Sequence, residues 1–259
     1  MAWLAHKPTE NISLTRARSI LVHFIILLVC FLALAPMLWL IGRADIAGLK
    51  RVLLDSSWRD AIVNSIFLAS IQAVVSTLLA GMMGFAMAKH DFFGRKIVLM
   101  GLVFTMLVPA QLLMPGAFEM VMKTGLFDTR LAAIFPGLFS VFGSLLMMQA
   151  IARVPDETLH AARLDGCNEL RVWWDIVMPQ IIPTTTTLAV LSFAAAWNAL
   201  LWPSLILASE SKATAAMWAA NVAFNASSGE LSDTSFIAAA VLLTMSPVLL
   251  LGLLHTNDD

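Results

Sequence analysis

Long apolar runs alternate with short polar segments along the whole chain, and six of the runs are long enough to cross a membrane as helices. A helix needs about 20 predominantly apolar residues to span the roughly 30 Å hydrocarbon core. The pattern therefore predicts an all-α membrane protein with six transmembrane helices. Their approximate bounds are residues 19–41, 61–88, 97–122, 131–152, 180–209 and 236–254. Short strands of alternating polarity, which would predict a membrane barrel, do not occur in the sequence.

The composition agrees with this membrane assignment. Of the 259 residues, 59% are hydrophobic and only 13% are charged, and the mean hydropathy is +0.84. Soluble domains are about a quarter charged. The net charge of −1 and the lack of a basic cluster in the sequence give no indication of a nucleic-acid partner. No linker divides the chain, so we expect residues 1–259 to form a single transmembrane domain.

The first apolar run is predicted to be a membrane anchor that is retained. Arg16 and Arg18 precede more than twenty apolar residues, which is longer than the core of a signal peptide, and no small-x-small cleavage motif follows. With the N-terminus in the cytoplasm, nine Lys and Arg residues fall in cytoplasmic segments and seven in outer segments. The positive-inside rule thus favours a cytoplasmic N-terminus, by a margin too small for charge alone to decide.

Two further features predict how the spans bend and pack. In a membrane bundle, neighbouring helices can satisfy the carbonyl groups that a proline leaves free, so we expect bends within spans and not span ends. The prolines concerned are Pro109, Pro115, Pro183, Pro203 and Pro247. Small residues recur every four positions in the second run and predict a face for close helix packing. They are Ser76, Ala80, Gly84 and Ala88.

One polar stretch stands out between the fourth and fifth runs. Residues 154–179, here called the polar segment, read VPDETLHAARLDGCNELRVWWDIVMP and carry seven Asp, Glu or Arg residues. Pro155 can end the preceding span. Asp156 suits a helix N-cap, with Glu157 favourably placed near the positive end of the helix dipole.

Within the polar segment we expect two short helices. The first covers Thr158–Leu164 and buries Leu159, Ala162 and, less neatly, Ala161. Gly166 fits the left-handed conformation that ends such a helix. Asn168 can cap the second helix, Glu169–Val177, and Pro179 precedes the fifth span. From these residues alone the segment is either a solvated loop or a docking element for another protein, because small residues ringed by charges suit a cleft.

Several motifs resemble one known family. AARLDG, followed by Met178-Pro179, resembles the EAA loop of binding-protein-dependent ABC importer permeases. The stretches VPAQLLMPGAFEMVMKTGLFDT, FPGLFSVFGSLLMMQAIARVPDE and SFAAAWNALLWPSLIL resemble the carbohydrate-uptake permeases of the maltose MalG type. The resemblance covers about residues 64–207 and implies the MetI-like fold of type I importers.

The resemblance also implies partners and site residues. It implies a bacterial inner-membrane permease that pairs with a second permease, an ATPase dimer and an external binding protein that delivers a carbohydrate. ATP and Mg²⁺ would be bound by the ATPase, and no cofactor by this chain. The coupling residues would be Pro155, Asp156, Glu157, His160, Ala161, Ala162, Arg163, Asp165, Gly166 and Pro179. His160 departs from the family, which has glutamate there, and Glu157 is a candidate stand-in.

Polar groups inside the spans are candidates for the substrate pathway, because such groups tend to face the bundle interior. These are Gln72, Gln111, Glu119, Trp197 and Asn198. The alternative for each is ordinary hydrogen bonding between helices. His23 is expected to be a bundle residue, and Cys30 and Cys167 to be free thiols.

Other classes of function find little support in the sequence. It has neither metal-ligand spacing nor a phosphate-binding G-x-x-x-x-G-K-[ST] loop, so we expect neither a metal site nor ATP hydrolysis by this chain. A membrane enzyme would need paired ionisable groups, and only His23 and Glu119 are candidates. Import of another solute, such as glycerol phosphate, and a scaffold without transport remain as alternatives.

Overall fold

The computed structural model describes residues 12–228 and 233–256, and within these ranges the chain is helical and contains no strand. Three helices cover the first, second and sixth predicted spans without interruption. They are α1 (Ile12–Ile41), α3 (Ser56–Lys89) and α14 (Thr234–Thr256). Pro247 lies inside α14, as predicted. All three are long and apolar enough to cross a membrane.

The other three predicted spans are broken helices. Each broken pair has the length and composition of one span, so the described part of the chain has up to six spans. The pair α4 (Arg95–Leu107) and α5 (Ala110–Lys123) is bent by 99°. A bend of 49° separates α6 (Arg130–Ile134) with η1 (Phe135–Gly137) from α7 (Val141–Ala152).

The break before α5 corrects the prediction of a continuous helix bent at Pro109. The helix ends at Leu107, and Val108 adopts an extended conformation with ψ 117°. The residue before a proline is disfavoured in the helical region, and proline has no N–H to donate. With 13 residues, α4 is only about 20 Å long. Pro115, in contrast, lies inside α5.

The predicted fifth span, 180–209, is also wrong in extent. Its main helix is α11 (Ile182–Trp197), which makes an 89° bend with the helical stretch before it. Residues 198–200 then interrupt the helix before α12 (Leu201–Ile206), which contains Pro203. Four further elements lie in the loops between these helices. They are α2 (Ile46–Leu54), α8 (Asp156–Leu164), η3 (Glu210–Lys212) and α13 (Ala215–Ser227).

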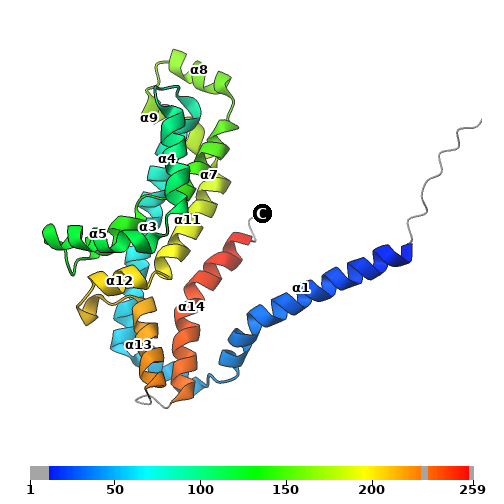
Figure 1. The fold of residues 1–259 in the computed structure, drawn as a ribbon, viewed down its shortest axis with the longest axis vertical. Helices are drawn as coiled ribbons and strands as arrows, with labels where there is room; N and C mark the ends of the chain where they lie inside the picture. The colour runs from blue at the N-terminus through cyan, green and yellow to red at the C-terminus, as the bar shows by residue number, and fades with distance from the viewer. Residues whose placement is uncertain (1–11, 229–232, 257–259) are drawn as a thin grey trace, which may run out of the picture.

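Helix α3 forms the centre of the bundle, with α7 and α11 packed along it (Figure 1). The predicted small-residue face is confirmed: Ser76, Ala80 and Gly84 are buried, and Ala88 packs against the core. A Cβ added to Gly84 would lie 2.7 Å from Met147 Cβ, so the two helix backbones approach closely at this glycine. Close approach of this kind is what stabilises helix pairs in lipid.

Helix α1 projects away from the bundle (Figure 1). None of its apolar window, Ser19–Ile41, is buried by the rest of the described chain. Helix α4 likewise has no buried residue. Exposed apolar surface on this scale requires lipid or another membrane protein.

Candidate functional site

The polar segment forms a compact unit across the end of α3 and α7 (Figure 1). It consists of α8, the short helix α9 (Glu169–Arg171), the π-helix η2 (Val172–Val177) and α10 (Met178–Gln180). Leu159 and Ala162 are buried, as predicted, and join one core cluster with residues of α3, α7 and η2. Ala161 is exposed, which corrects its predicted burial. Only one of the two adjacent alanines faces the bundle, since neighbouring helical positions do not share a face.

Lys89, the last residue of α3, attaches α8 to the bundle. Its side chain is 6% exposed, and its Nζ donates to the Val154 carbonyl and to Asp156 Oδ1, each at 2.6 Å. The predicted N-cap role of Asp156 is wrong, because Pro155 occupies the cap position and Asp156 begins the helix. The carboxylate is drawn to the lysine instead. This hydrogen bond holds the pKa of Asp156 below its ordinary value.

The turn after α8 has the predicted geometry. Gly166 adopts a left-handed φ of 84°, and a Cβ there would meet no atom within 4 Å. The Asn168 side chain accepts from the Arg171 N–H at 2.9 Å and so caps α9, as predicted. The turn therefore needs glycine for its backbone conformation and not for lack of space.

The second helix of the polar segment is not the continuous α-helix that the sequence predicts. Residues Val172–Val177 are wound as a π-helix, in which the Met178 N–H bonds to the Trp173 carbonyl. Single π-helical turns are rare and are frequently found at functional sites. Pro179, which has no N–H, follows directly, and the chain then bends sharply at Ile181 into α11.

A second set of polar contacts joins the two halves of the polar segment. Arg163 makes two bonds to Glu169, from Nε at 2.8 Å and from Nη2 at 3.1 Å. His90 Nε2 lies 3.3 Å from Glu169 Oε2, the oxygen that also accepts from Arg163 Nη2, and its ring packs edge-on against Phe85. Bidentate arginine–carboxylate pairs fix orientation as well as distance. The polar segment is thus fixed internally and against α3.

Its outer surface, in contrast, combines charge with exposed apolar groups. Leu164 is 88% exposed and Leu170 is 63% exposed. Glu157, His160 and Asp165 are exposed and form no hydrogen bond or ion pair with any side chain in the described part of the chain. Exposed apolar residues rimmed by polar ones are typical of a protein–protein contact.

The substrate-pathway candidates lie in different surroundings. Gln72 packs directly on Gly137, where a Cβ would lie 2.1 Å from its Nε2. Gln111 lines a hollow of about 280 Å³ beside α5. Trp197 is buried and donates to the Thr244 carbonyl at 3.0 Å, the interhelical bond that the sequence left open. Asn198 is exposed and donates to its own helix.

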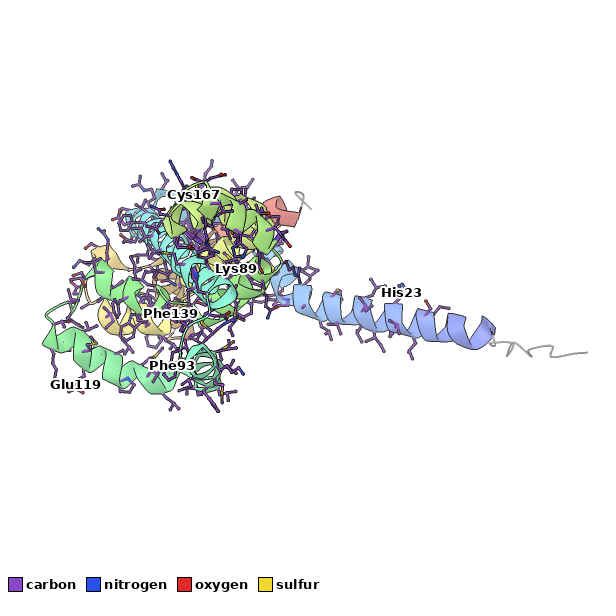
Figure 2. All side chains as sticks on the ribbon, turned by 90° about the horizontal axis from the view of Figure 1, so that it is seen from above. His23, Lys89, Phe93, Glu119, Phe139 and Cys167 are labelled. Carbon is purple, nitrogen blue, oxygen red and sulfur yellow. The ribbon has the colours of Figure 1, made fainter. Side chains whose placement is uncertain are left out.

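The two ionisable candidates in the apolar runs lie far apart. Figure 2 shows His23 on the projecting α1 and Glu119 on the opposite side of the molecule. His23 Nδ1 lies 2.7 Å from the Ser19 carbonyl of the same helix. Glu119 pairs with Lys123 at 2.6 Å, one turn along α5. Cys30 and Cys167 are free thiols, as predicted.

Sequence reasoning missed a polar cavity at the other end of α3. It has a volume of about 550 Å³ and lies between the first turns of α3, the loop through η3, and α13. Its lining includes Asp60, Glu210, Asn221 and Asn225. The spacing of the two asparagines, four residues apart on one helix face, is the signal that could have found it.

The loops around this cavity are held by two polar clusters. Asp128, with φ 56°, accepts bonds from the Ala208 and Ser209 N–H groups and from Lys212 Nζ at 2.7 Å. These bonds hold its pKa well below the ordinary range, with the lysine as the largest cause. Asn64 is buried and donates to the Ser211 carbonyl at 2.8 Å. The mouth of the cavity is therefore a fixed structure.

The fold is that of a multi-helix membrane protein in which the polar segment, fixed to α3 and α7, lies between two broken spans. Residues 76–257 match the family described as binding-protein-dependent transport system inner membrane component. The match covers more than half of the chain, and the chain belongs to this family.

Similar proteins and structures agree with the family. The chain is 31% identical over 146 residues to an arabinooligosaccharide transport permease, AraQ, of Halalkalibacterium halodurans, covering 56% of this chain and 52% of that protein. It is 28% identical over 193 residues to the sn-glycerol-3-phosphate permease UgpE of Yersinia pestis, covering 74% and 68%. The chain spans about half the length of the first of these relatives.

Among solved structures, the chain is similar to part of a bacterial ABC transporter involved in the import of the acidic polysaccharide alginate. The TM-score is 0.81 at 21% identity, over 93% of this chain and 96% of that chain. A second structure of the alginate transporter, in complex with a pentasaccharide-bound periplasmic protein, gives a TM-score of 0.69 at 16% identity, over 94% of each chain. These matches establish the fold.

Proposed function

We propose that this chain is one permease half of an ATP-driven importer for a carbohydrate. It would pair with a second permease, take its substrate from an external binding protein, and transmit movement from an ATPase dimer. That ATPase would bind the ATP and Mg²⁺, so this chain would be a non-catalytic subunit. Family membership, and relatives named for arabinooligosaccharide transport, support the proposal.

The observation that carries the coupling role is the contrast between the two sides of the polar segment. Its inner side is fixed to α3 through Lys89, and its outer side presents Leu164 at 88% exposure among unpaired charges. A displacement of the outer side would therefore be transmitted to the spans, because the polar segment is fixed to α3. Ala161 and Gly166 keep the outer surface low enough for close contact, while Ala162 packs inward.

The proposed orientation follows from this role. The polar segment would face the cytoplasm, as in the topology with a cytoplasmic N-terminus in a bacterial inner membrane. Pro155 and Pro179 bound the segment, so a displacement of α8 would act on α7 and α11. His160 is exposed on the docking face and would contact the ATPase where the family has a glutamate.

A pair of matched variants tests the coupling. Gly166 and Gly125 both have a positive φ, of 84° and 68°, and neither has an atom within 4 Å of its missing side chain. Gly166→Glu should leave the complex assembled but should uncouple ATP hydrolysis from uptake. Gly125→Glu carries a similar backbone strain away from the docking face and should retain coupling. Normal uptake with Gly166→Glu would rule out the coupling role.

A second candidate is import of a phosphorylated polyol. The similarity to a glycerol-3-phosphate permease supports it, at 28% identity over a larger share of the chain than the AraQ match. Uptake of labelled neutral saccharides and of glycerol 3-phosphate by the complete transporter separates the two. Gln72, Gln111, Trp197 and Asn198 remain candidates for the pathway. A scaffold without transport predicts uptake of neither substrate and no associated ATPase.

A further inference from the structure

Helix α13, which lines the cavity, lies at the opposite end of α3 from the polar segment (Figure 1). Asp60 lines it in the second turn of α3, and Lys89 ends the same helix at the polar segment. A helix rises 1.5 Å per residue, so about 44 Å separate these two positions. This exceeds the roughly 30 Å hydrocarbon core. If the polar segment faces the cytoplasm, the cavity faces the outside.

The cavity has the size and mixed lining of a small-molecule site. Its volume of about 550 Å³ falls within the range of ordinary ligand pockets. Asn221 and Asn225 supply amides that both donate and accept, and Ser57 supplies a hydroxyl. Trp218 also lines the cavity, is 9% exposed, and has no acceptor for its indole N–H among the described residues. The lining therefore places hydrogen-bonding groups beside an aromatic ring.

The charge of the cavity is entirely acidic. Asp60 and Glu210 are its ionisable lining residues, and neither forms an ion pair within the described chain. Arg59 is adjacent to Asp60 in sequence but does not line the cavity, since neighbouring helical positions face different directions. Lys212 is held by Asp128. A carboxylate-bearing ligand would therefore meet two negative charges and no cation among the lining residues.

We propose that this cavity binds a neutral, hydroxyl-rich saccharide at the external mouth of the permease and discriminates against acidic saccharides. The inference rests on the proposed import function, because that function places the cavity outside. Amides, hydroxyls and carboxylates bind sugar hydroxyls, and the Trp218 indole offers both a donor and an aromatic edge. Discrimination arises from repulsion, which rejects a competitor without tighter binding of the preferred ligand.

Cysteine protection in the complete transporter tests the proposal. Ala208 lines the cavity and is exposed, so Ala208→Cys adds a single sulfur atom. Ala223 is exposed on α13 outside the cavity, so Ala223→Cys is the matched control. Each is made with Cys30 and Cys167 replaced by serine. Right-side-out vesicles are treated with a membrane-impermeant maleimide, with and without arabinotriose, maltotriose, cellotriose or trigalacturonate.

The expected results are specific. At a concentration about ten times its Kd, a neutral trisaccharide should slow labelling of Ala208→Cys about tenfold and leave Ala223→Cys unchanged. Trigalacturonate should protect only at higher concentration. In the Asp60→Asn variant, the Kd for trigalacturonate should fall about fourfold. This factor is the repulsion removed between the Asp60 carboxylate and one ligand carboxylate about 5 Å away in water. The same should hold for Glu210→Gln, and binding of the neutral sugar should change less.

The outcomes separate this inference from the proposed function. If neither cysteine is labelled from outside, the topology and with it the proposed function fail. If both are labelled but no neutral trisaccharide protects Ala208→Cys, the saccharide site is refuted while import can stand. Equal or better protection by trigalacturonate refutes the charge selection. Protection by a sugar-free binding protein alone would assign the cavity to protein docking and refute the inference.

Discussion

Replacing Lys89 by methionine tests how α8 is attached to the bundle. The Lys89 side chain is 6% exposed and donates to the Val154 carbonyl at 2.6 Å. A hydrogen bond from a charged donor contributes about 1.5–3 kcal/mol net. The bond to Asp156 adds little to this free energy. The Asp156 carboxylate is 68% exposed, so water can hydrogen-bond to it when the lysine is absent. Methionine keeps the apolar stem, so opening of α8 should become easier by about 1.5–3 kcal/mol.

Amide hydrogen exchange measures this opening directly. One factor of ten corresponds to about 1.4 kcal/mol, so the α8 amides should exchange about 10- to 150-fold faster in Lys89→Met at constant pH. Helix α3 should keep its protection. The control is Lys123→Met, which breaks a pair whose side chains are 73% and 66% exposed and should change exchange by no more than a few-fold. Exchange in α8 that changes less than about threefold in Lys89→Met would refute the reasoning.

Three further predictions follow from single positions. Gly84→Ala should lower the free energy of unfolding by about 1–3 kcal/mol in reversible unfolding from detergent, because the new methyl would lie 2.7 Å from α7. The control is Gly101→Ala, where no atom lies within 4 Å and no such loss is expected. Equal effects of the two variants would contradict the close helix approach. Gly166→Asn should keep coupled ATPase activity better than Gly166→Ala, because asparagine tolerates a positive φ. Higher coupled activity in Gly166→Ala than in Gly166→Asn would be inconsistent with a left-handed turn. The pKa of Asp156 lies below its ordinary 3.8, so the stabilisation it gives α8 is present above pH 3.8 and is lost as the pH falls through the folded-state pKa. Because this carboxylate is 68% exposed, a spin label on α8 should become only slightly more mobile in that range. Asp156→Asn should remove the pH dependence, and its persistence would assign it to another group.

The polar segment shows how far local sequence signals reach. Gly166 and Asn168 behave as predicted, because a left-handed turn and a helix cap depend on the residue and its nearest neighbours. Asp156 does not, because a buried lysine 67 positions earlier in the chain competes for its carboxylate. The π-helix at Val172–Val177 was not predicted from the sequence, and Val172, Trp173 and Val177 within it are buried in the core.

The broken spans likewise separate what local sequence predicts from what helix packing decides. Pro109 marks a position where a helix can bend, but the sequence does not say whether neighbouring helices will preserve the span. Here α4 buries none of its own residues against the bundle, and the chain turns by 99°. At Pro247 the helix continues, so proline alone does not determine the outcome.

By itself, the sequence determined the all-α membrane class, the small-residue face of α3 and the position of the polar segment. Each depends on hydrophobicity or on spacing along one helix, and both are properties of adjacent residues. Only the tertiary structure decided that Lys89 holds α8 and that Trp197 is committed to α14. It alone assembled the acidic cavity, because Asp60 and Glu210 meet across 150 residues of chain. Contacts of that range depend on how the helices pack, which no local pattern encodes.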